Sequence, residues 1–277
     1  MGILFALLAA AAYGVSDFVG GIASRRVSAL SVLLVSYPIG GALMALMLIG
    51  YGGPVSGATL AWSLAGGVVG LTGVALLYSA LALAPMNVIS PVTALMSAVV
   101  PVFGGVMQGE RPHLPAWLGI GLGLVAVVLI SRQPLDHPHG PVGWRPLSMA
   151  VLAGVGFGAY FICLAESDHD SGMWPVVISR ACSAVLVLPL VFTGGRFSPM
   201  RLPVLGLAAV AGTLDASANV AFLLASRHGL LSLSGVITAL YPAGTVLLAV
   251  LVLKERTGSV QRAGLALAVL AVVLLTR

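Results

Sequence analysis

Ten long apolar runs, separated by short breaks of charge, proline or glycine, limit the folds available to this chain. The runs lie near residues 3–22, 29–49, 60–82, 88–107, 115–131, 147–166, 174–194, 203–225, 231–252 and 260–276. A helix that crosses about 30 Å of hydrocarbon needs roughly 20 apolar residues, so each run is long enough for one crossing. The runs lack the alternation of an outer-membrane barrel. The sequence therefore predicts an all-α polytopic membrane protein with ten transmembrane helices.

The composition excludes several other classes. Of 277 residues, 59% are hydrophobic and 8% charged, whereas about a quarter of the residues in soluble domains are charged. The same apolar content excludes disorder. The net charge of +5 comes from basic residues scattered singly, so we expect no nucleic-acid partner. Cys163 and Cys182 lie within apolar runs, and we interpret them as small core residues that form neither a disulfide framework nor a metal site.

The two halves of the chain are similar to each other. Aligning Glu110-Arg111 with Glu255-Arg256 also brings Thr93-Ala94-Leu95 onto Thr238-Ala239-Leu240 and Gly119 onto Gly264. Each half has five runs, an odd number, so the second half enters the membrane from the opposite side. The sequence thus predicts two inverted-topology five-helix repeats, 1–132 and 147–277, joined by a linker at 133–146.

The end of each half resembles the EamA repeat of the drug/metabolite transporter (DMT) superfamily. That repeat has a proline, a helix of apolar residues, Glu-Arg, and then a glutamine and a glycine on the next span. The second half has Pro242, Glu255-Arg256, Gln261 and Gly264 in this spacing. The first half keeps Glu110-Arg111 and Gly119 but has Ser97 and Ala116 at the proline and glutamine positions. The resemblance covers nearly the whole chain and implies a small-molecule transporter.

The first run carries a second likeness. Asp17, Gly20 and Arg25 have the spacing of the acid, glycine and base in the first helix of small multidrug-resistance proteins. In those proteins the acid is the shared proton and substrate site, so the resemblance implies proton coupling through Asp17. The EamA pattern more often has a polar uncharged residue at this position.

Asp17, Arg180 and Asp215 lie well inside the predicted spans. An ionisable group in hydrocarbon costs about 2.5–3.5 kcal/mol on insertion scales, so each one needs an explanation. In the functional interpretation the aspartates bind protons or a cationic group, and Arg180 clamps a substrate carboxylate or pairs with one aspartate until substrate displaces it. In the structural interpretation an Asp–Arg pair holds helices together. We favour function for both aspartates, and both interpretations stay open for Arg180.

Polar and aromatic residues share helix faces with these acids. Asn219 and Phe222 continue the face of Asp215, and Tyr13 lies one turn before Asp17. Such a strip suits a site for an organic solute, although Asn219 equally suits a structural hydrogen bond between helices. Tyr160 and Tyr241 are further candidates, and Tyr241-Pro242 predicts a helix kink that frees carbonyls near the site.

A membrane-embedded enzyme and a channel are the alternatives. The chain lacks the Gly-x-Gly-Asp, His-Glu-x-x-His and Gly-x-Ser-x-Gly signatures, and it lacks a P-loop. No segment is typical of a selectivity filter. We therefore expect a secondary-active transporter rather than an enzyme, with no cofactor and no metal. We expect it to move a small organic metabolite, amino-acid-like or amphipathic and cationic, by alternating access. The family resemblance implies export, and Asp17 makes the proton a candidate coupling ion.

The orientation in the membrane is open on sequence grounds. Most basic residues fall in the breaks on the side opposite the termini, so the positive-inside rule places both termini outside. The family resemblance implies both termini inside. We expect a plasma or inner membrane location, contact with the lipid bilayer, and either a monomer or a homodimer.

Overall fold

The computed structural model describes residues 1–24, 26–81, 83–84, 86–131, 143–193, 199–254 and 258–276. Within these ranges the chain is almost entirely helical, and its only strand-like pairing is an isolated antiparallel bridge between Gly52 and Gly172. The helices are α1 (Gly2–Ser24), α2 (Ala29–Tyr51), α3 (Gly57–Leu81), α4 (Met86–Met107), α5 (Leu114–Ser131), α6 (Trp144–Ala165), α7 (Trp174–Thr193), α8 (Leu202–His228), α9 (Leu231–Thr238), α10 (Tyr241–Leu253) and α11 (Ser259–Leu275), with a 3-10 turn η1 (His169–Ser171) before α7.

These helices account for the ten predicted spans. In the described part of the chain, eight helical stretches are long and apolar enough to cross a membrane, and one of them, Leu231–Val252, runs through both α9 and α10. Shorter apolar helices at Trp174–Pro189 and Ser259–Leu275 supply the other two. The predicted all-α membrane fold is therefore confirmed.

The ninth span is broken near its middle. Helix α9 ends at Thr238, and α10 begins at Tyr241 with a proline in its first turn. Pro242 has no N–H with which to continue the α9 ladder, so the backbone turns through Ala239 and Leu240 before the helix resumes. The break lies at Tyr241-Pro242, where the sequence predicted a kink.

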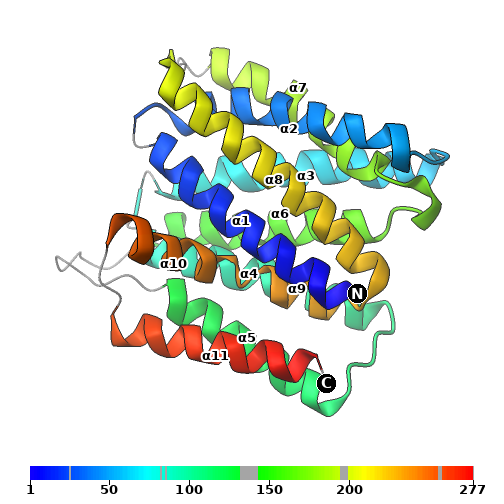
Figure 1. Ribbon diagram of the computed structural model, residues 1–277, viewed down its shortest axis with the longest axis vertical. Helices are drawn as coiled ribbons and strands as arrows, with labels where there is room; N and C mark the ends of the chain where they lie inside the picture. Colours follow the sequence, from blue (N-terminus) through cyan, green and yellow to red (C-terminus); the bar gives the residue numbers. More distant parts are fainter. Residues whose placement is uncertain are drawn as a thin grey trace.

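The two halves interlock (Figure 1). Helix α1 packs along α8, and α3 along α6, so the first helix of each half contacts the third helix of the other. Helix α2 packs against α7, and α5 against α11, each against its own counterpart. Helix α4 packs on α6, while its counterpart α9–α10 packs on α1. This reciprocal pairing is that of two inverted repeats. The linker predicted at 133–146 lies mostly outside the described residues, so its boundaries stay a prediction.

Glycine allows several of these helix pairs to approach closely. A Cβ on Gly14 of α1 would lie 2.7 Å from the Tyr241 carbonyl oxygen, and one on Gly264 of α11 would lie 2.8 Å from the Ile130 amide nitrogen. Gly154 of α6 faces the carbonyl oxygen of Thr93 on α4. The family glycine Gly264 and the buried Gln261, whose side chain donates to the Ile130 carbonyl oxygen over 3.4 Å, therefore serve packing between α5 and α11.

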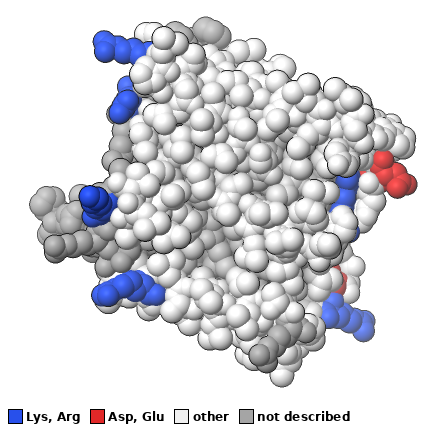
Figure 2. Space-filling view, in the orientation of Figure 1, with Lys and Arg blue, Asp and Glu red and all other residues white. Residues whose placement is uncertain are grey.

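Charge is distributed unevenly between the two ends of the bundle. Both termini lie at one end, on the right in Figure 1. Basic side chains line the opposite end, on the left in Figure 2, where no acidic side chain is visible, whereas the acidic side chains visible in that view lie at the end with the termini, together with further basic ones. The described basic residues at the left end are Arg26, Arg145, Arg201, Lys254 and Arg262. We call this end the basic face and the other the terminal face.

Candidate functional site

An ion pair lies in the middle of the bundle. The Arg180 guanidinium, on α7, donates to the Asp215 carboxylate, on α8, and this is the one salt bridge among the described residues. The Arg180 side chain is 9% exposed and that of Asp215 is 32% exposed. The Asn219 amide lies one turn further along α8 and donates to the Asp215 carbonyl oxygen (2.6 Å) and carboxylate (3.2 Å). The structure therefore brings together three of the predicted residues.

Tyr37 completes the surroundings of Arg180. The guanidinium carbon of Arg180 lies 4.5 Å from the centroid of the Tyr37 ring, in a cation–π contact. Helix α2 reaches this position because Gly40 packs against the Gly212 carbonyl oxygen of α8, where a Cβ would lie 2.7 Å away. Gly41, one turn after Tyr37, leaves room for the Arg180 side chain. Tyr37 was not predicted as a site residue, although its helical spacing from the Gly40-Gly41 pair is visible in the sequence.

Asp17 lies apart from this pair. Its side chain is exposed and, within the described ranges, makes neither a hydrogen bond nor an ion pair. It interacts electrostatically with Asp215 of α8 and with Tyr241 of α10, the helices that flank α1. The neighbouring Ser16 is buried and donates to the Ala211 carbonyl oxygen at 2.9 Å. Asp17 thus has an unpartnered carboxylate beside a paired one.

Aromatic rings extend from the ion pair toward the terminal face. The Tyr13 ring centroid lies 6.2 Å from that of Phe161 and 6.4 Å from that of Tyr241. Phe161 stacks on Phe222 with 4.0 Å between centroids. Tyr160 packs its ring against the glycine face of α3 and interacts electrostatically with Arg180. Among the aromatic candidates, Tyr13, Tyr160 and Tyr241 lie near the charged residues, and Phe161 is an addition that the sequence did not single out.

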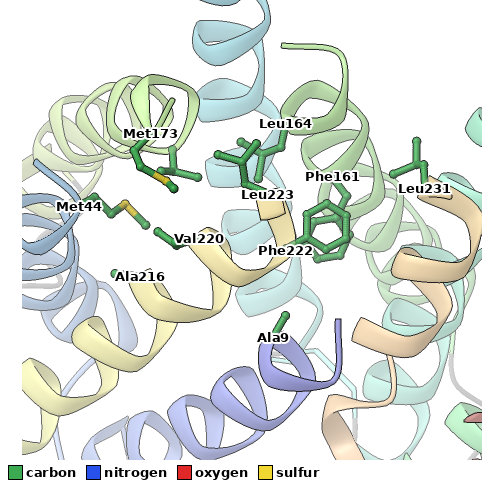
Figure 3. Packing of buried hydrophobic residues seen from close by; sticks show 11 residues of the cluster. Ala9, Met44, Phe161, Leu164, Met173, Ala216, Val220, Phe222, Leu223 and Leu231 are labelled. Atoms are coloured by element: carbon green, nitrogen blue, oxygen red, sulfur yellow. The ribbon is translucent and has the colours of Figure 1, made fainter. Parts of the chain in front are cut away.

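Phe222 has a different position from the other candidates. It is fully buried in an apolar cluster between the ion pair and the terminal face, shown in Figure 3. The cluster comprises Ala9, Met44, Phe161, Leu164, Met173, Val176, Ala216, Val220, Phe222, Leu223 and Leu231. In Figure 3 the Phe161 and Phe222 rings lie face to face between α6 and α8. We call this group the apolar plug; along α8 it runs from Ala216, next to Asp215, to Leu223, near the end of the helix.

Polar contacts tie the loops together on the terminal face. The Asp168 carboxylate accepts from the Ser56 hydroxyl and from the Thr59 hydroxyl (3.2 Å), which joins the α6–α7 loop to the start of α3. Arg227, at the end of α8, donates to the carbonyl oxygens of Gly172 (2.8 Å) and Asp168 (3.0 Å). The Trp174 indole N–H donates to the Gly53 carbonyl oxygen at 3.0 Å. The α2–α3 loop, the α6–α7 loop and α8 are thereby held together beyond the apolar plug.

This arrangement can bind a solute with charges of both signs. A buried guanidinium with one carboxylate partner can exchange that partner for the carboxylate of a ligand. Asp17 and Asp215 offer negative charge nearby, and the three tyrosines offer ring faces and hydroxyls. Among the described residues no group of three or more His, Cys, Asp or Glu side chains has a geometry for a metal ion. Glu255 and Arg256 of the second EamA motif lie outside the described residues.

A bundle of ten spans in two interlocked inverted repeats, with ionisable residues in its interior, defines a class of polytopic membrane carriers. The EamA-like transporter family model matches residues 1–132 and again 144–277. The chain belongs to this family, and hence to the DMT superfamily, whose members are membrane transporters rather than enzymes.

Structural comparison agrees with this fold. A solved structure described only as a crystal structure of a protein aligns with a TM-score of 0.78 and 20% sequence identity, over 99% of this chain and 96% of the other. At that identity the likeness concerns the fold alone. Comparison with curated proteins finds no match.

Proposed function

We propose that this protein is a secondary-active carrier that moves a small organic solute across the plasma or inner membrane by alternating access. The observation that carries the proposal is the Arg180–Asp215 pair, held in the bundle interior by Asn219 and by the Tyr37 ring. Burying an ionisable pair costs desolvation free energy, and ionisable residues within membrane spans are characteristic of functional sites. The proposed purpose is reversible exchange of Asp215 for a ligand group.

The proposed solute is amino-acid-like, or otherwise amphipathic with a cationic group. Its carboxylate would take the place of Asp215 on Arg180, because guanidinium and carboxylate form two parallel hydrogen bonds. Its amine would lie between Asp17 and Asp215, and an apolar side chain would contact the rings of Tyr13, Tyr160 and Tyr241. A solute with a charge of only one sign would leave either Arg180 or the two aspartates without a partner, so a zwitterion fits the site best.

The proposed coupling ion is the proton, bound at Asp17. The support is that Asp17 has no hydrogen-bond or ion-pair partner within the described ranges, whereas Asp215 has two. A carboxylate without a fixed partner can alternate between proton and substrate amine as the site changes sides. Export is the direction implied by the family resemblance.

The proposed orientation places the basic face in the cytoplasm, and both termini outside. Its support is the set of exposed arginines and Lys254 at that end (Figure 2), which are favoured on the cytoplasmic side. Anionic headgroups of the cytoplasmic leaflet would then surround the basic face. With the terminal face tied shut, the described conformation would face the cytoplasm.

Transport into proteoliposomes tests the proposal. A panel of labelled amino acids and cationic dyes is offered to the wild-type protein with and without an imposed pH gradient. We expect gradient-dependent movement of at least one solute, lost in Asp17→Asn and kept in Glu166→Gln, a matched neutralisation at the end of α6. Solute transport by the wild-type protein at the same rate with and without the pH gradient would refute proton coupling. Asp17→Asn would then transport like Glu166→Gln.

A further inference from the structure

Glu110, from the Glu-Arg motif of the first half, lies against the broken helix of the second half. Its carboxylate accepts from the backbone N–H of Leu231 (2.5 Å) and from that of Ser232 (3.0 Å), the first two residues of α9. Leu230, which precedes α9, supplies no side-chain cap. The first N–H groups of a helix lack intrahelical partners and attract negative charge. Glu110 therefore caps α9 from another helix, a role that the side chain of the N-cap residue usually has.

The end of α4 is shaped to deliver this carboxylate. Gly109 has a φ of +90°, a left-handed conformation that glycine adopts without strain. The turn closes with hydrogen bonds from the Glu110 N–H to the Gly105 carbonyl oxygen (2.9 Å) and from the Gly109 N–H to the Val106 carbonyl oxygen (3.1 Å). A Cβ on Gly105 would overlap the Glu110 carboxylate. Two glycines thus direct Glu110 back toward α9, and among the ion pairs of the described residues there is none between Glu110 and Arg111, which the motif places beside it.

Helix α9 is closely packed along its whole length between this cap and the region of the ion pair. The helix is buried, and Gly235 fits so closely against Pro101 of α4 that a Cβ there would lie 2.6 Å from the Pro101 ring. The break after α9 is itself hydrogen-bonded, from the Ala239 N–H to the Gly235 carbonyl oxygen (2.9 Å) and from the Leu240 N–H to the Ile237 carbonyl oxygen (3.1 Å). Tyr241 follows at once and contacts Tyr13. A shift of α9 along α4 would therefore displace the Tyr241 ring.

We infer that Glu110 is a positioning residue, which fixes the broken helix α9–α10 so that the Tyr241 ring faces Tyr13. The part of the inference that concerns solute binding rests on the proposed function. The part that concerns helix position does not, and it is tested without a substrate. The cap links the end of α4 in one half to the broken helix in the other, so it couples the two halves at the terminal face.

The test measures the accessibility of position 241 to a small water-soluble thiol reagent. The reporter is Tyr241→Cys in a background with Cys163→Ser and Cys182→Ser. We expect Glu110→Ala to change its labelling rate by about tenfold or more, since a hydrogen bond to a charged group is worth at least that factor. Glu110→Gln, which keeps one acceptor oxygen, should give a smaller change. The neighbouring Arg111→Gln is the control and should give none.

A second reporter separates positioning from general loosening. Tyr37→Cys on α2 is distant in sequence from α9–α10, and its labelling rate should stay unchanged in the Glu110 variants. Equal changes at both reporters, or no change at position 241 in Glu110→Gln and Glu110→Ala, would overturn the inference. If Glu110→Ala fails to fold, the Glu110→Gln result decides. A wild-type protein that labels as expected but transports nothing would refute the proposed function and leave the positioning role intact.

Discussion

Neutralising Asp215 and neutralising Asp17 should affect stability very differently, although the two carboxylates belong to one region. Removing one partner of a buried ion pair leaves an uncompensated charge and costs about 3–5 kcal/mol. Asp215 is about one-third exposed (32%), so solvent near its carboxylate reduces that cost, and the Tyr37 ring retains part of the attraction for Arg180. We therefore expect Asp215→Asn to lower the free energy of unfolding by about 2–3 kcal/mol. Asp17→Asn, at an unpartnered carboxylate, should change it by about 0.5 kcal/mol or less.

The assay is equilibrium unfolding of the purified protein in mixed detergent micelles, with a double-mutant cycle between the two partners. Arg180→Gln alone should be destabilising. Combined with Asp215→Asn it should recover part of the loss, with a coupling energy of about 1.5 kcal/mol or more. Equal effects of Asp215→Asn and Asp17→Asn, or a coupling energy near zero, would show that the pair does not stabilise the fold and would refute this reasoning.

Three further predictions follow from the packing. Gly14→Ala should destabilise by about 1–3 kcal/mol in the same unfolding assay, because its Cβ would strike the Tyr241 carbonyl oxygen. Gly21→Ala in the same helix has open space at its Cβ and should stabilise by about 0.5–1 kcal/mol; the reverse order would contradict the observed α1–α10 contact. Arg227→Ala removes the hydrogen bonds from α8 to the α6–α7 loop and should speed proteolysis of that loop several-fold. An unchanged cleavage rate would show that these hydrogen bonds do not hold the loop in place. Tyr37→Leu, tested by solute uptake, should raise KM more than it lowers Vmax if the ring holds Arg180 in place, and an effect on Vmax alone would contradict that role.

The spans and their inverted arrangement could be predicted because few backbone conformations are stable in lipid. Backbone groups in hydrocarbon must be satisfied within the helix, so long uncharged runs become helices whatever their neighbours do. The break at Tyr241-Pro242 was also visible, since proline lacks the donor that the helix needs. The repeat followed from charged and loop positions such as Glu110 and Glu255, which match by chance less readily than apolar ones.

The partners within the site were harder to predict. Arg180 and Asp215 lie on different helices, and only the packing of α7 and α8 on α2 selects Asp215 over Asp17 as the partner. Tyr37 and Phe161 were missed because an aromatic residue in a membrane helix carries no signal of its own, and Phe222 shared a helix face with Asp215 yet lies in the apolar plug. Glu110 follows the end of a span, and nothing in the sequence around it shows that a turn at Gly109 directs its carboxylate onto the second half.

Counterflow in proteoliposomes shows whether this EamA-like transporter works as an alternating-access carrier. Vesicles loaded with a high concentration of an unlabelled amino acid are diluted into a trace of the same labelled compound. A carrier with one site accessible to one side at a time should take up the label transiently above its equilibrium level, and Arg180→Gln should abolish the overshoot while Glu166→Gln preserves it. Uptake that rises to equilibrium without an overshoot, for a solute that the wild-type protein demonstrably moves, would indicate a channel and contradict the account.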